Sequence, residues 1–173
     1  MSHKTQILEI KKKNLKGVTL LELVVVMAIV GIMVTVITVS FGSENTKKNL
    51  ETNAREFSSI LREAQNYSLT GRQNDSSNTT CAYSITWTIA TSTYRLNAIS
   101  KNGTLCNGTS ASVATYALKQ GVVFSNGGAA TFSLPWGATA SGSAVLGKAG
   151  LSHTICLNGS GKIIDQTGSG SCP

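Results

Sequence analysis

The chain has 173 residues, a length typical of one globular domain with appendages, which argues against a multidomain enzyme. Charged residues make up only 13% of the chain and apolar residues 41%, a balance that excludes an intrinsically disordered protein. Five of the fifteen cations behind the net charge of +7 lie in residues 1–17, and the other ten cations and seven anions leave +3 over residues 18–173. A net charge that comes largely from the N-terminal end of the chain does not by itself indicate nucleic-acid binding.

An uncharged apolar run of nineteen residues extends from Leu23 to Phe41, or twenty-four from Val18 if Glu22 is allowed as its single charge. As a helix this run would cross the ~30 Å hydrocarbon core of a bilayer. A secretory signal peptide, the alternative, has a shorter apolar region of ~7–15 residues and a small-residue cleavage site. Four lysines with no acid among them precede the run: Lys11, Lys12, Lys13 and Lys16. The positive-inside rule therefore predicts a single membrane pass over residues 18–42, with a cytoplasmic N-terminus and residues 43–173 exported.

Glu22 is the only charge in this span. Inserting a carboxylate into a membrane costs ~2.5–3.5 kcal/mol at a helix centre, and less near a helix end, so we expect Glu22 to have a partner and a role. A snorkelling acid at the membrane interface is the simpler alternative. The stretch KGVTLLELVVVMAIVGIM, with Gly17 before Val18 and Glu22 four residues later, resembles the leader and N-terminal helix of type IV prepilins.

The resemblance implies that residues 1–17 are a cytoplasmic leader, which a membrane-embedded prepilin peptidase removes by cutting between Gly17 and Val18. It also implies that the new amino group of Val18 is methylated, and that Glu22 pairs with the N-terminal amine of a subunit in the growing filament. The single helical turn between Val18 and Glu22 permits such an ion pair within or between subunits. The sequence departs from the family at Val18, where phenylalanine is commoner, and at Val39, where many major pilins have a proline.

Residues 43–72 are predicted to continue as an amphipathic helix that packs on a sheet rather than forming a free coiled coil. Its apolar stripe follows spacings of three and four residues: Leu50, Ala54, Phe57, Leu61, Ala64 and Ser68. Gly71 is the expected C-cap. The segment AREFSSILREAQNYSLTGRQ resembles the corresponding part of H-type (GspH) pseudopilins of type II secretion and of FimT-like minor pilins.

Residues 73–173 are predicted to form a β-rich domain, because short β-prone runs alternate there with Asn-Gly turn signals. The expected strands are 82–89, 94–99, 113–118, 122–124, 130–134, 151–157 and 162–164. We expect an α+β, pilin-like fold in which the long N-terminal helix packs on an antiparallel sheet of about five to seven strands. Residues 73–80 and 137–150 are expected to be surface loops by composition, and residues 158–161 the turn of a terminal hairpin.

Four cysteines lie on the predicted exported side: Cys81, Cys106, Cys156 and Cys172. An even number in an oxidising compartment favours disulfides, and of the three possible pairings chain order favours Cys81–Cys106 and Cys156–Cys172. The sequence has no C-x-x-C motif, and His153 is the one histidine left after processing. We therefore expect no metal site.

Motifs for catalysis are missing from the sequence. Gly142–Lys148 matches the start of a P-loop, but Ala149 replaces the required Ser or Thr. His153 has no nucleophile elbow to serve as a general base. We expect neither an enzyme nor a bound cofactor.

The favoured interpretation is a structural pilin or pseudopilin subunit of a type IV pilus or a type II secretion-type filament. The family implies as partners a prepilin peptidase, other pilin or pseudopilin subunits, an assembly ATPase and a platform protein in the plasma membrane. It implies a location in the plasma (inner) membrane before assembly, and in a cell-surface or periplasmic filament afterwards. The alternative is a FimT-like minor pilin that binds extracellular DNA for uptake. DNA binding needs clustered cations that reach phosphates, but the cations of the predicted β-rich part are scattered in sequence: Arg72, Arg95, Lys101, Lys119, Lys148 and Lys162.

Replacing Gly17 with valine should leave the lysine-rich leader attached, because a β-branched residue does not fit a peptidase pocket that accepts a hydrogen side chain. Mass spectrometry of the mature N-terminus measures this. We expect the native protein to begin at Val18, and a native N-terminus at any other residue would contradict the assignment.

Overall fold

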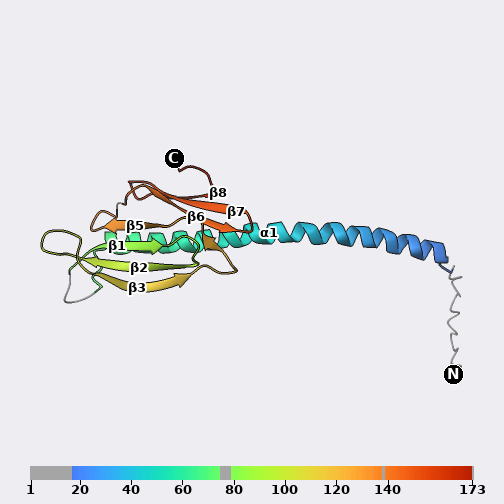
Figure 1. Ribbon diagram of the computed structural model, residues 1–173, viewed down its shortest axis with the longest axis horizontal. Coiled ribbons are helices and arrows are strands. Elements are labelled where there is room, and N and C mark those ends of the chain that lie inside the picture. Colours follow the sequence, from blue (N-terminus) through green and yellow to red (C-terminus); the bar gives the residue numbers. More distant parts are fainter. Residues whose placement is uncertain (1–16, 75–78, 138, 173) are drawn as a thin grey trace, which may run out of the picture. The chain divides into compact units, whose positions relative to one another are not determined.

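The computed structural model describes residues 17–74, 79–137 and 139–172, except for the side chains of residues 36–42. The predicted leader, apart from Gly17, lies outside the described residues. The chain divides into two compact units, Met1–Phe41 and Gly42–Pro173. One helix, α1 (Leu20–Leu69), contributes residues to both units, and the strands belong to the second (Figure 1).

In the first unit, α1 begins directly after Thr19, whose side-chain oxygen accepts a hydrogen bond from the backbone N–H of Glu22 at 3.3 Å. Thr19 is therefore the N-cap of the helix. The described side chains from Gly17 to Thr35 are all exposed. Across the part of the chain with described side chains, no helix is both long and apolar enough to cross a membrane. The last seven residues of the predicted span 18–42 lie outside that part.

In the second unit, α1 is amphipathic and buries the predicted stripe. Leu50, Ala54, Phe57, Leu61, Ala64 and Ser68 are each at most 2% exposed. The helix ends at Leu69, three residues before the predicted end. Gly71 has a φ of 64°, its N–H donates to the carbonyl of Ser68, and the N–H of Arg72 donates to the carbonyl of Tyr67. This is a Schellman cap, so the predicted role of Gly71 is confirmed.

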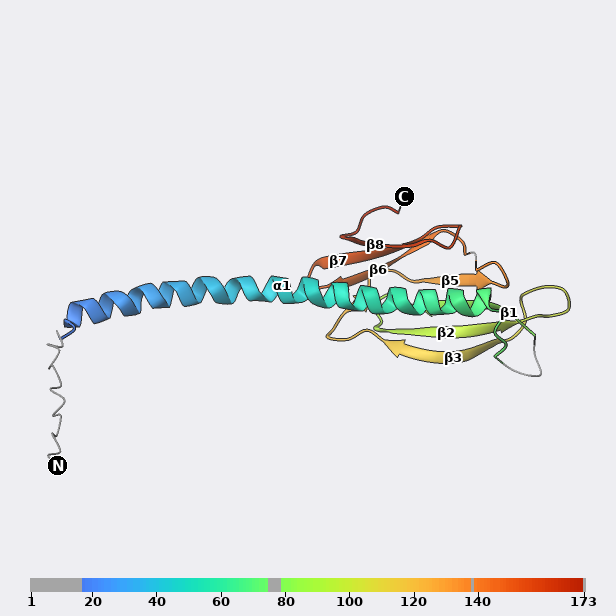
Figure 2. The ribbon, with the colours of Figure 1, turned by 180° about the vertical axis from the view of Figure 1, so that it is seen from behind.

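Two antiparallel four-stranded sheets replace the single sheet that the sequence predicts. The first has the order β3-β2-β1-β5 and the second β4-β6-β7-β8. Their bounds are β1 (Thr80–Trp87), β2 (Thr93–Ser100), β3 (Ser110–Ala117), β4 (Val123–Phe124), β5 (Gly128–Ser133), β6 (Gly142–Lys148), β7 (Leu151–Leu157) and β8 (Ile163–Thr167). In Figure 2 this part of α1 crosses in front of the strands, with β2 and β3 on one side of it and β6, β7 and β8 on the other.

The prediction of a surface loop over residues 137–150 is wrong, because β6 lies within it. Glycine, serine and alanine dominate this strand, so its composition is that of a loop. Burial shows the strand instead, since Ala144 and Leu146 alternate with less buried neighbours and are fully covered. Ala149 and Gly150, with φ values of 49° and 78°, form the tight turn into β7. The first strand also starts inside the predicted loop 73–80, at Thr80.

The core of the second unit is centred on Phe57 of α1. Its ring packs edge-on against Trp87 at 5.6 Å and Tyr94 at 5.0 Å, both in the first sheet, and against Phe124 of the second sheet at 5.3 Å between ring centroids. Burial raises the pKa of Tyr94, so its hydroxyl stays neutral. Few aromatic residues are present, but this cluster concentrates them where the helix meets both sheets.

Replacing Phe57 with alanine should lower the free energy of unfolding by ~3–5 kcal/mol, because it opens a cavity between the helix and both sheets. Trp136→Ala is the matched control, since this aromatic side chain is 79% exposed. The control should change stability by no more than ~0.5 kcal/mol. Urea denaturation of the detergent-solubilised full chain, followed by circular dichroism, measures both variants. Equal losses would contradict the central role of Phe57.

Candidate functional site

The predicted cleavage site lies just before the first turn of α1. Gly17 and Val18 precede the helix, and Val18 is 68% exposed. A Cβ atom built on Gly17 would meet no described atom within 4 Å. The described fold therefore has room for a side chain at this position. A requirement for glycine would come from a partner such as a peptidase.

Glu22 occupies the third helical position, one turn after the N-cap. Together, Thr19 and Glu22 match the capping-box pattern, in which a threonine N-cap is followed three residues later by a glutamate. A carboxylate in the first turn also interacts favourably with the helix dipole. Sequence reasoning missed this second role, although the T-x-x-E spacing displays it. Any test of Glu22 must therefore separate capping from pairing with an amine.

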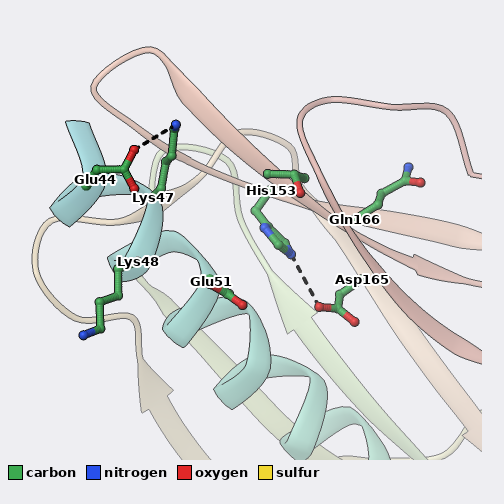
Figure 3. A pocket seen from close by; sticks show the side chains of 8 residues that line it. Glu44, Lys47, Lys48, Glu51, His153, Asp165 and Gln166 are labelled. Carbon is green, nitrogen blue, oxygen red and sulfur yellow. Dashed lines mark hydrogen bonds and ion pairs between the residues drawn. The ribbon is translucent and has the colours of Figure 1, made fainter. Parts of the chain in front are cut away.

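A second candidate site is a pocket of about 570 Å³ between α1 and the β7–β8 hairpin in the second unit (Figure 3). It is lined by Glu44, Lys47, Lys48, Glu51, His153, Asp165, Gln166 and Thr167. In Figure 3, His153 lies between the helix and Asp165, with Glu51 facing the same space from α1. The four helix residues of this lining lie beside the buried stripe of α1, at the edge of the helix that borders the hairpin.

His153 is the buried member of this pocket. It is 6% exposed, and its Nε2 atom has no hydrogen-bond partner among the described residues. Oδ2 of Asp165 lies 3.7 Å from this nitrogen, and that carboxylate is about half exposed. Within the described residues, no group of three or more His, Cys, Asp or Glu side chains is arranged to hold a metal ion.

The structure joins Cys81 to Cys106 and Cys156 to Cys172, the pairing that chain order favours. No cysteine is left free. The first disulfide connects β1 to the loop after β2, and the second connects β7 to the segment after β8.

Half of the cations considered for DNA binding are already engaged. The ammonium of Lys119 forms an ion pair with Glu56 and contacts both carboxylate oxygens, at 2.9 and 3.0 Å. The ammonium of Lys148 donates to the backbone carbonyl of Gln120. The guanidinium of Arg72 lies 4.2 Å above the ring of Tyr67.

Comparison with known families matches residues 12–38 to the prokaryotic N-terminal methylation motif. The match supports a type IV pilin-like protein. The matched residues include the end of the predicted leader, Gly17, Val18, Glu22 and the start of α1, and the motif implies processing by prepilin peptidase and assembly with other pilins. It also suggests an N-terminal membrane anchor and a surface filament for this chain. No curated protein and no solved structure matches the sequence.

Proposed function

We propose that this chain is a pilin or pseudopilin subunit of a type IV pilus or type II secretion-type filament, assembled through α1. The match of residues 12–38 to the methylation motif carries the proposal. The described start of α1 adds support, because its large apolar side chains between Val18 and Val34 are 47–82% exposed. A helix that is apolar all round needs lipid or other helices around it. Residues 18–42 provide the membrane anchor before assembly and the filament core afterwards.

Processing follows the motif. Prepilin peptidase removes residues 1–17 by cutting between Gly17 and Val18, and the amine of Val18 is methylated. The new amine lies one helical turn from Glu22, and in the filament the carboxylate of Glu22 pairs with the amine of a neighbouring subunit. Among apolar helices an unpaired charge is costly, so the requirement to pair the amine with the carboxylate can set the axial register of assembly.

The remaining segments form the exported part of the subunit. The helix from residue 43 to Leu69 is its amphipathic half, and the strands between Thr80 and Thr167 form a β domain stabilised by two disulfides. Within the family, we place the chain in the H-type pseudopilin and FimT-like subgroup. The segment from Ala54 to Gln73 and the terminal β7–β8 hairpin support this placement, since both resemble that subgroup in sequence. Structural assembly is favoured over DNA binding because three of the six candidate cations have partners within the chain.

Replacing Glu22 with leucine tests the proposal, because a membrane anchor and a filament subunit respond differently. Membrane insertion should be at least as good, since removal of the carboxylate saves up to ~2.5–3.5 kcal/mol. Incorporation into filaments should fail, since an amine left unpaired among apolar helices costs ~3–5 kcal/mol. Membrane fractionation and quantification of sheared filaments measure the two effects.

Glu22→Gln is the control that separates capping from pairing. Glutamine also serves as the third residue of a capping box, so the helix start is retained while the charge is lost. Filament content should fall between the native and Glu22→Leu levels. Unchanged filament content in Glu22→Leu would reject the pairing role, and a native chain that never enters filaments would reject the proposed function.

A further inference from the structure

Four asparagines of the chain are followed directly by glycine: Asn102, Asn107, Asn126 and Asn158. At such a pair the backbone nitrogen of the glycine can attack the side-chain carbonyl carbon of the asparagine, and ammonia leaves as a five-membered succinimide ring closes. Water then opens the ring to aspartate or isoaspartate. Glycine favours this reaction because it has no Cβ atom to obstruct the ring closure. All four pairs meet the sequence requirement, so their surroundings in the fold decide which of them reacts.

Two of the four side chains are held in place by hydrogen bonds. Oδ1 of Asn126 accepts from the backbone N–H of Val145 at 2.8 Å, and its Nδ2 donates to the carbonyl of Ser143 at 2.8 Å, so both ends of the amide are bound to β6. Oδ1 of Asn158 accepts three bonds of 2.6–3.1 Å within the β7–β8 turn, one of them from the hydroxyl of Ser160. Ring closure at either residue would first break these bonds and leave polar groups unpaired.

Asn107 has a free side chain, but the nitrogen that would attack it is occupied. The side chain is exposed and has no hydrogen-bond partner among the described residues. The N–H of Gly108 donates to the carbonyl of Ser100 at 2.9 Å. A Cβ atom built on Gly108 would lie 2.6 Å from the same oxygen, so the backbone here is packed against the end of β2. The nitrogen must lose this bond before it can attack.

At Asn102 neither reacting group is bound. The N–H of Asn102 donates to the carbonyl of Leu105 at 2.8 Å, and the N–H of Leu105 donates back at 3.2 Å, which makes Gly103, with a φ of 63°, the first residue of a two-residue turn. Within the described part of the chain, neither the N–H of Gly103 nor the side chain of Asn102 has a hydrogen-bond partner, and both residues are exposed. In Figure 2 the loop between β2 and β3 extends beyond the ends of both strands.

We propose that Asn102 is a site of spontaneous deamidation, and that the fold directs the reaction to this one of the four Asn-Gly pairs. The nitrogen of Gly103 gives its proton to hydroxide and bonds to Cγ of Asn102, while the bond from Cγ to Nδ2 breaks and Nδ2 leaves as ammonia with a proton from water. A water molecule then adds to one of the two ring carbonyls, so the reaction consumes one water and releases one ammonia. Asn102 and Asn107 both line a surface hollow of about 420 Å³, so access of water does not distinguish them.

The product differs from the original chain in charge and in backbone. A carboxylate replaces a neutral amide next to Lys101, so the net charge falls by one in each chain that reacts. Isoaspartate also places the side-chain methylene of residue 102 in the main chain, inside the loop that the Cys81–Cys106 disulfide closes. The reaction needs only water and residues of this loop, so it does not depend on the proposed filament.

Peptide mapping of the detergent-solubilised full chain tests the selectivity. The chain is kept in mildly alkaline buffer, acidified at intervals to stop the reaction and digested with pepsin, and fragmentation mass spectrometry measures conversion at each of the four asparagines. In the folded chain Asn102 should convert about tenfold or more faster than Asn107, because the barrier at Asn107 includes the loss of a hydrogen bond. The control is the same chain reduced and unfolded in guanidinium chloride, where this difference should disappear.

A matched pair of variants assigns the change in charge to one residue. Asn102→Gln and Asn107→Gln both keep an exposed amide, but glutamine would need a six-membered ring, which closes far more slowly. Isoelectric focusing of the native chain should show a more acidic species that grows with time. The Asn107→Gln variant should form this species at the native rate, and the Asn102→Gln variant should form it about tenfold or more slowly. Circular dichroism checks that both variants fold as the native chain does.

Three results would overturn the proposal. In the folded chain, Asn107, Asn126 or Asn158 could convert as fast as Asn102. The folded chain could keep the amide of Asn102 while the unfolded chain loses it, or the Asn102→Gln variant could acidify at the native rate. A native chain that enters no filament would reject the proposed function and leave this reaction unaffected.

Discussion

The second unit depends on the packing of one helix side chain, Phe57, against aromatic rings from two separate sheets. Trp87 and Tyr94 belong to the first sheet and Phe124 to the second, so the three ring contacts give both sheets a common core with α1. Each sheet buries a face against the helix, and neither would have a closed core without it. The amphipathic part of α1 is therefore an integral element of the domain.

Two polar side chains fix how this helix sits on the sheets. The buried Asn53 accepts a hydrogen bond from the backbone N–H of Lys119 at 2.7 Å, and the amide of Gln65 donates to the carbonyl of Gly161 at 3.0 Å. Sliding or rotating the helix would break both bonds and leave buried polar groups unpaired, at ~1–3 kcal/mol each. This register keeps Glu44 and Glu51 beside the β7–β8 hairpin, and so it creates the pocket around His153.

The features that follow from local spacing could be predicted from the sequence. The buried stripe from Leu50 to Ser68 repeats every three or four residues, and the methylation motif is contiguous, so both are visible without a fold. β6 was missed because its small residues resemble a loop, and its burial depends on neighbouring strands. The division into two sheets was missed because strand pairing is decided by contacts distant in sequence. For the same reason the pocket was not foreseen: its helix and hairpin residues are about a hundred positions apart.

Each disulfide joins a strand of one sheet to a segment that follows another strand of the same sheet. Cys81–Cys106 closes the end of the β1–β2 pair, and Cys156–Cys172 ties the C-terminal segment to β7. Neither disulfide joins one sheet to the other, so apart from the backbone connections the sheets are held together by noncovalent packing. Chemical reduction would therefore loosen the two ends of the domain separately, while the aromatic rings around Phe57 stayed packed. Its first effect would be on the outer surface of the subunit and not on the helix.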